Sequence, residues 1–249
     1  MYCSLIKIFI VCVILFLNEM VHGIIPDYIK VCKRSEPNVN DCIRNSVEQI
    51  RPKLLEGIPE LEVPPIEPME IPEVSLTRGP KSANIEALIS NVRVWGPANF
   101  VIQTLESDLE NNKFDFKILL PKLYFEGKYN LNARILLLNL HGNGNINGTF
   151  TNYKSNVSMQ GHKIKKGDAE HLLFDRLKLK LSIGKAKLYF SNLFNGDPVL
   201  GPAVNQIIND NSQTFINEIA PALERSIADV FTDIANKITL KFTYDELFP

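Results

Sequence analysis

The side chains that could carry chemistry in this chain of 249 residues are few and scattered. His141, His162 and His171 lie in turn-like or charged surroundings and lack the spacing of metal ligands. Asp245 and Glu246 form an acidic pair in a C-terminal segment expected to be exposed, where a raised carboxyl pKa is hard to arrange. The sequence contains neither G-x-S-x-G nor H-E-x-x-H. We therefore expect no enzyme, no metal site and no cofactor.

The N-terminal 23 residues have the features of a secretory signal peptide. Lys7 supplies the positive charge, residues 8–17 form a short apolar run, and Val21-His22-Gly23 offers a cleavage site. The run is too short to span a membrane comfortably. The sequence thus predicts a secreted mature chain, 24–249, that folds as a single domain.

Cys32 and Cys42 are the cysteines that remain after the signal peptide is removed. In an oxidising compartment such a pair is most simply a disulfide, with two free thiols as the alternative. Metal binding would need more ligands nearby, and a redox role would favour Cys-x-x-Cys. We interpret the pair as structural.

The charge balance argues against a nucleic-acid partner, and the glycine-rich segment argues against a phosphate-binding loop. The 27 basic and 28 acidic residues nearly cancel and form no long run, which argues against a nucleic-acid partner. Residues 141–148 are rich in glycine, but their spacing fits no phosphate-binding loop, so we expect a turn or bulge there.

Asn147 and Asn156 begin N-glycosylation sequons, which matter if the chain is secreted.

A long amphipathic helix is predicted over 204–238, where apolar residues including Ile207, Phe215 and Ile219 recur every three or four positions. Glu224 and Asn236 are among the polar residues expected to face solvent. Pro221 should bend this helix without interrupting it. Charges and amides interrupt it too often for a membrane span. A shorter helix is predicted from Asn40 to Leu54, followed by an extended proline-rich segment over 57–72.

The middle of the chain is predicted to form an antiparallel sheet. Alternating or β-branched and aromatic residues mark strands over 85–94, 99–108, 113–120, 122–132, 135–140, 145–153, 155–163, 170–183 and 185–190. Such short connections permit antiparallel pairing only. The sheet and the long helix each have one apolar face, so we expect an α+β fold in which they pack together.

Several ordered motifs resemble the insect takeout and juvenile-hormone-binding protein family. They comprise Cys32 with Asp41-Cys42-Ile43, Arg51-Pro52 before Gly57-Ile58-Pro59-Glu60-Leu61, Val63-Pro64, Glu67-Pro68, Leu193-Phe194-Asn195-Gly196, Val204-Asn205, and the C-terminal Tyr244-Asp245-Glu246-Leu247-Phe248-Pro249. This resemblance implies a single long helix wrapped by a highly curved antiparallel sheet, as in lipid-transfer proteins. It also implies a hydrophobic tunnel between helix and sheet that carries a small apolar ligand.

One departure from the hormone carriers concerns the cysteines. Strict juvenile-hormone carriers have a second disulfide deeper in the chain, whereas this sequence has no cysteine after Cys42. The chain is therefore more similar to takeout proteins. The ligand classes that this similarity leaves open are terpenoids, fatty acids or esters, and quinone-like lipids.

The predicted function is a secreted, monomeric, non-enzymatic carrier without stable membrane insertion. The alternatives are a secreted protein that binds another protein or a membrane surface and has a filled core, and a lipid hydrolase. From the alternation we predict that the tunnel is lined by Trp95, Phe116, Ile118, Tyr129, Leu131, Phe215, Ile219 and Leu223.

Overall fold

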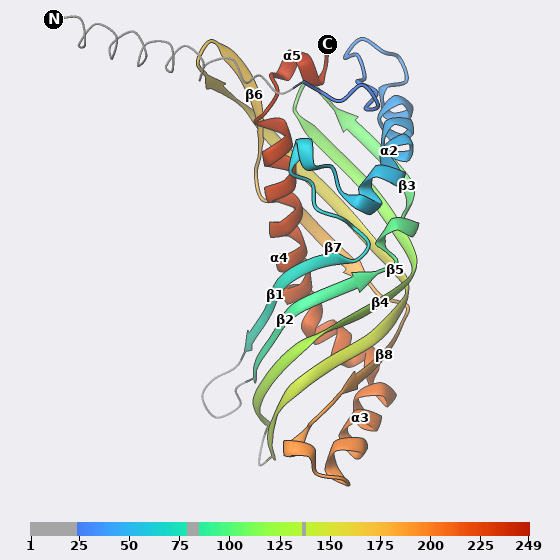
Figure 1. Ribbon diagram of the computed structural model, residues 1–249, viewed down its shortest axis with the longest axis vertical. Helices are drawn as coiled ribbons and strands as arrows, with labels where there is room; N and C mark the ends of the chain where they lie inside the picture. Colours follow the sequence, from blue (N-terminus) through green and yellow to red (C-terminus); the bar gives the residue numbers. More distant parts are fainter. Residues whose placement is uncertain (1–23, 79–84, 136–137) are drawn as a thin grey trace, which may run out of the picture.

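The fold is organised around one long helix, α4 (Ser212–Thr239), in a computed structural model that describes residues 24–78, 85–135 and 138–249. A strongly curved antiparallel sheet wraps around this helix (Figure 1). The eight-stranded sheet has the order β1-β2-β4-β5-β6, while β3 pairs with β4, and β7 and β8 pair with β5. The predicted α+β architecture, a long helix wrapped by a curved antiparallel sheet, is confirmed.

The other helices and the strands have the following bounds. The strands are β1 (Met69–Arg78), β2 (Ile85–Trp95), β3 (Val101–Asp108), β4 (Lys113–Ile135), β5 (Leu138–Lys166), β6 (Ala169–Phe174), β7 (Lys178–Ser182) and β8 (Lys185–Phe190). The helices are α2 (Val39–Glu56), α3 (Leu200–Asp210) and α5 (Tyr244–Leu247), with single 3₁₀ turns at Pro59–Leu61, Pro97–Asn99 and Phe194–Gly196.

Two strands are much longer than the sequence predicts. The sequence predicts two separate strands on either side of Pro121, but β4 is continuous through this residue and pairs with β5 from Lys113 to Ile135. Proline is tolerated there because β4 pairs with β3 only up to Leu119 and with β2 only from Tyr124, so the intervening edge needs no backbone donor. The predicted 170–183 strand is instead two strands, β6 and β7.

The glycine-rich segment 141–148 lies within β5, so the predicted turn or bulge there is wrong. Its glycines are explained by close backbone approach. A Cβ at Gly148 would lie 2.4 Å from the carbonyl oxygen of Lys187, and one at Gly144 would lie 2.6 Å from that of Ser191. Both contacts are sterically forbidden, so only glycine allows β8 and the residue after it to lie this close to β5.

The predicted 204–238 helix is divided at Asn211, where φ is −114° and ψ is 27°. α3 precedes this residue and α4 follows it, and α4 is continuous through Pro221, as predicted. α3 lies along β8, and this packing sets its direction (Figure 1). The sequence predicts that Ile207 lies on the buried apolar side of the helix. This prediction is wrong: Ile207 is 58% exposed because α3 turns its opposite side toward β8.

Polar side chains of α3 and α4 close the open edges of β6, β7 and β8. Both atoms of the Asn236 amide bond the backbone of Phe174: its Oδ1 accepts from the N–H (2.7 Å), and its Nδ2 donates to the carbonyl (3.0 Å). Asn205 does the same for Phe190, and Asn209 for Leu188. These amides supply the pairing that a neighbouring strand would otherwise provide.

Two further side chains of α4 bond strand edges in the same way. Glu224 accepts from the N–H of Leu181 (3.1 Å), and Thr232 accepts from that of Leu177 (3.0 Å). The prediction that Glu224 and Asn236 face solvent is therefore wrong. Periodicity identifies the polar side of a helix, but it does not show that strand edges lie against that side.

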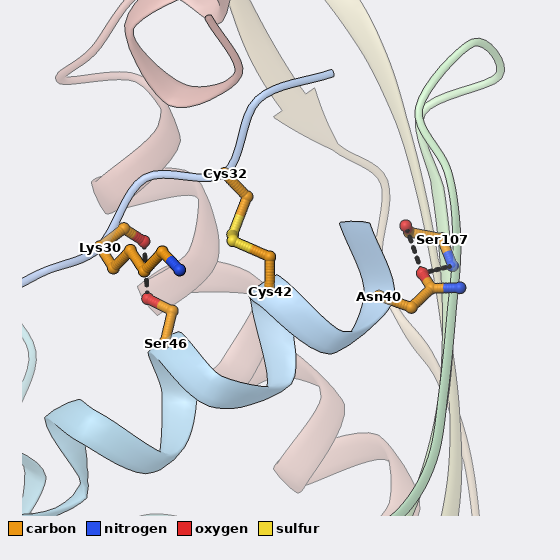
Figure 2. Close-up of a disulfide and its surroundings, with 6 residues drawn as sticks. All are labelled: Lys30, Cys32, Asn40, Cys42, Ser46 and Ser107. Carbon is orange, nitrogen blue, oxygen red and sulfur yellow. Dashed lines mark hydrogen bonds between the residues drawn. A yellow bond between two sulfur atoms is a disulfide. The ribbon is translucent and has the colours of Figure 1, made fainter. Parts of the chain in front are cut away.

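The predicted Cys32–Cys42 disulfide is present and fastens the N-terminal segment to α2 (Figure 2). On the same helix, Ser46 Oγ donates to the carbonyl of Lys30 (2.7 Å). Asn40 Oδ1 accepts from both the N–H and the hydroxyl of Ser107 on β3. The bridge and these hydrogen bonds together hold α2 against the sheet and the N-terminal segment.

We expect the double replacement Cys32→Ala/Cys42→Ala to lower the free energy of unfolding by about 2.5 to 3 kcal/mol, because the open chain gains the entropy that the closed loop denies it. Chemical denaturation of both proteins measures this difference. Intact mass before and after reduction with alkylation provides the companion test. Two thiols that alkylate without reduction in the secreted protein would contradict the bridge.

Candidate functional site

An apolar cavity of about 680 Å³ lies between α4 and the inner face of the sheet. α2 and the proline-rich segment that follows it complete the wall. The lining of α4 extends from Phe215 to Thr239, which corresponds to roughly 36 Å at 1.5 Å per residue. The volume lies in the range of sites for small organic molecules.

The inner face of β4 shows where this space is open. Phe114, Phe116, Ile118 and Leu120 line the cavity and are only partly buried. Beyond Pro121 the inward side shifts by one residue, and Leu123, Phe125 and Tyr129 are each less than 10% exposed. Leu123 and Phe125 still line the cavity but are more deeply buried than the residues before Pro121, whereas Tyr129 is not among the described residues of the cavity wall.

Five of the residues predicted to line a tunnel lie in the cavity wall. They are Phe116 and Ile118 on β4 and Phe215, Ile219 and Leu223 on α4. The α4 residues share one face through the helical repeat, and this face points toward the sheet. Phe215 stands at the end of the space, where its ring meets that of Phe190 edge-on at 6.0 Å between centroids.

The other three predicted residues, Trp95, Tyr129 and Leu131, are not part of the cavity wall. Trp95 follows the inward Val94 and so points to the opposite face, where its ring lies beside Tyr124. Tyr129 belongs to the filled part of the core: its ring packs edge-on against Phe190, and its hydroxyl donates to the carbonyl of Ser191 (2.7 Å). Leu131 packs against the core that contains Tyr129 and Phe190.

Other lining residues were not assigned to the site from sequence. α2 contributes Ile43, Val47, Ile50 and Leu54, and the proline-rich segment contributes Pro64, Pro65 and Ile66. The periodic apolar face of α2 was visible in the sequence. Its position over the cavity depends on tertiary contacts, among them the disulfide and Arg51, which donates to the carbonyls of Ala98 and Phe100.

Two polar side chains of β5, Tyr153 and Ser155, lie in the buried wall of the cavity. Burial raises the pKa of the Tyr153 phenol, and the nearby carboxylate of Glu224 raises it further. A hydrogen bond with the Ser155 hydroxyl acts in the opposite direction. The phenol is therefore protonated and can donate a hydrogen bond.

The histidines and acidic residues considered for chemistry lie elsewhere. None of His141, His162 and His171 is among the described residues of the cavity wall. His162 Nδ1 lies 3.5 Å from the carboxylate of Asp175, and Asp245 pairs with Arg34. Within the described residues, the one group with metal-ligand proximity joins Glu36 to Cys32 and Cys42, whose sulfurs are already bonded to each other.

Comparison with known proteins places this geometry in context. The model of a family described as "Haemolymph juvenile hormone binding protein (JHBP)" matches residues 9–249. The chain is 22% identical over 231 residues to "Circadian clock-controlled protein daywake" of Drosophila melanogaster, covering 90% of this chain and 88% of that one. The Drosophila yakuba protein of the same name is 21% identical over the same length.

A solved structure matches the fold. The crystal structure of Epiphyas postvittana Takeout 1 superposes with a TM-score of 0.72 at 18% identity, covering 88% of this chain and 99% of that chain. Because the identity is low, this likeness supports the wrapped-helix architecture alone. Among the described residues, no helix combines the length and apolar character that crossing a membrane requires.

Proposed function

Because the chain belongs to the haemolymph juvenile hormone binding protein family, a family of binding proteins rather than enzymes, we propose that it carries a small hydrophobic ligand inside the cavity. The ligand lies between α4 and the inner face of the sheet. Apolar burial supplies most of the affinity, at about 25 cal/mol per Å². Phe116, Ile118, Phe215, Ile219 and Leu223 are the proposed contacts.

The observation that carries this proposal is the accessibility of inward-facing side chains. Phe116, Ile118 and Ile219 point into the molecule and border the cavity, and each is only partly buried. In a filled core such residues would be close-packed. This observation favours a carrier over the alternative of a protein whose core is solid and whose partners bind only outside.

The setting of the carrier is part of the same proposal. Residues 1–23, which lie outside the described residues, act as a signal peptide, and the secreted chain 24–249 is a monomeric single domain. The Cys32–Cys42 bridge suits an oxidising compartment. Asn156 is exposed and Asn147 is half-buried on the outer face of β5, and both are proposed to carry glycans. The ligand classes are terpenoids, fatty acids or esters, and quinone-like lipids.

We expect the purified protein to retain an apolar compound of low molecular mass. Native mass spectrometry of the secreted chain should show a mass above that of the polypeptide and its glycans, and solvent extraction should release a lipid. The delipidated protein should then bind a fluorescent apolar probe that added lipid displaces. If the delipidated protein neither binds such a probe nor recovers the lipid, the proposed carrier function is wrong.

A further inference from the structure

The polar groups of the cavity wall are concentrated at one place. Among the described residues of this wall there is no lysine, arginine or histidine. Four polar side chains contribute: Glu70, Tyr153, Ser155 and Thr239. Glu70 is exposed to solvent, and the Thr239 hydroxyl donates to the carbonyl of Ala235 (3.0 Å). The hydroxyls of Tyr153 and Ser155 are therefore the polar groups that the buried wall can offer.

These two hydroxyls lie partway along the cavity, not at its end. Tyr153 and Ser155 alternate with outward residues on β5 and so share its inner face, opposite Leu120 and Ile118 of β4. Glu224 approaches Tyr153 from α4. Along α4, Glu224 is roughly 13 Å from Phe215 and roughly 22 Å from Thr239, and apolar wall extends in both directions.

The pair has hydrogen-bonding capacity that the protein does not use. Each hydroxyl has one donor and two acceptor positions, and a bond between the two would occupy only one donor and one acceptor. Across the described parts of the chain, neither backbone groups nor charged side chains hydrogen-bond to either hydroxyl. Hydroxyls that border an apolar cavity with unused donor or acceptor positions favour a ligand oxygen at this place.

We propose that the Tyr153–Ser155 pair selects a neutral lipid with an oxygen function, such as a ketone, ester or alcohol, that has hydrocarbon on both sides. This inference rests on the proposed carrier function. A free carboxylate is disfavoured, because the described wall holds no cation to pair with its charge.

The test compares three lipids of one chain length: a straight alkane, a mid-chain ketone and the terminal carboxylate. Each displaces the neutral probe N-phenyl-1-naphthylamine from the delipidated full-length mature protein at about pH 8. The wild type should bind the ketone about three- to tenfold more tightly than the alkane, the size of one hydrogen bond between neutral groups. The carboxylate should bind most weakly of the three.

Variants then assign this preference to the pair. Tyr153→Phe and Ser155→Ala should each bring the ratio of ketone to alkane affinity toward one, because the variant wall no longer offers the hydrogen bond that distinguishes the two lipids. Thr239→Val is the matched control, because it also removes a hydroxyl from the wall, but one already bonded to the helix backbone. It should keep the wild-type ratio. Thermal unfolding of each variant confirms that the fold is retained, and either of the two β5 variants suffices for the test.

Two results would overturn the inference, and they are distinguishable from failure of the carrier function. Equal binding of all three lipids by the wild type, or an unchanged ratio in the β5 variants, would exclude the pair as the selecting group while leaving the carrier function intact. If the wild type binds neither the probe nor any of the lipids, the carrier function and this inference both fall.

Discussion

Replacement of Ile219 by tryptophan is expected to weaken binding of an apolar probe by about tenfold, equivalent to ~1.4 kcal/mol. The temperature at which the ligand-free protein unfolds should stay near that of wild type. Ile219 borders the cavity from α4 and is only partly buried. The larger ring can therefore extend into space that the ligand would use. Probe titration and calorimetry of the delipidated protein measure the two quantities.

The same substitution in a filled core has the opposite signature. Overpacking a close-packed site costs roughly 1 to 3 kcal/mol of folding free energy, so the variant would unfold at a distinctly lower temperature. Gln213→Trp is the control on the same helix, because Gln213 is exposed and its side chain donates to Asn217, one turn further along the helix. It should alter neither quantity. Sharp destabilisation by Ile219→Trp, or wild-type probe binding, would remove this part of α4 from the site.

Replacement of Asn236 by leucine is expected to destabilise the protein by roughly 2 to 4 kcal/mol. The amide of Asn236 satisfies both the N–H and the carbonyl of Phe174 at the edge of β6. Leucine has a similar volume but supplies neither partner, so two backbone groups in a partly buried place lose their hydrogen bonds. Chemical denaturation measures the change in the free energy of unfolding.

Asn217→Leu is the matched control for this second prediction. Asn217 is an exposed asparagine on the same helix, and its side chain accepts from Gln213 of the same helix. Its replacement should change stability by less than ~0.5 kcal/mol, as is usual for surface positions. If Asn217→Leu and Asn236→Leu destabilise the protein equally, the effect does not come from closure of the sheet edge, since leucine has a higher helix propensity than asparagine.

The sequence determines the kinds of element and their apolar faces, because these depend on local repeats. The three- to four-residue spacing around Phe215 and Ile219 predicts α4 and the side that it buries. Alternation over 113–120 likewise predicts the inward residues of β4, and Phe116 and Ile118 do line the cavity. The lone cysteine pair predicts the bridge. Each of these inferences uses residues that are close together in the chain.

The tertiary structure decides which apolar faces meet a filled core and which border an empty space. Tyr129 has the same alternation as Phe116, yet Phe190 and Ser191, some sixty residues later in the sequence, fill the space around it. The amides of Asn205 and Asn236 look like surface residues until the edges of β8 and β6 lie beside them. A cavity depends on the packing of side chains from distant segments, and local periodicity carries no information about that packing.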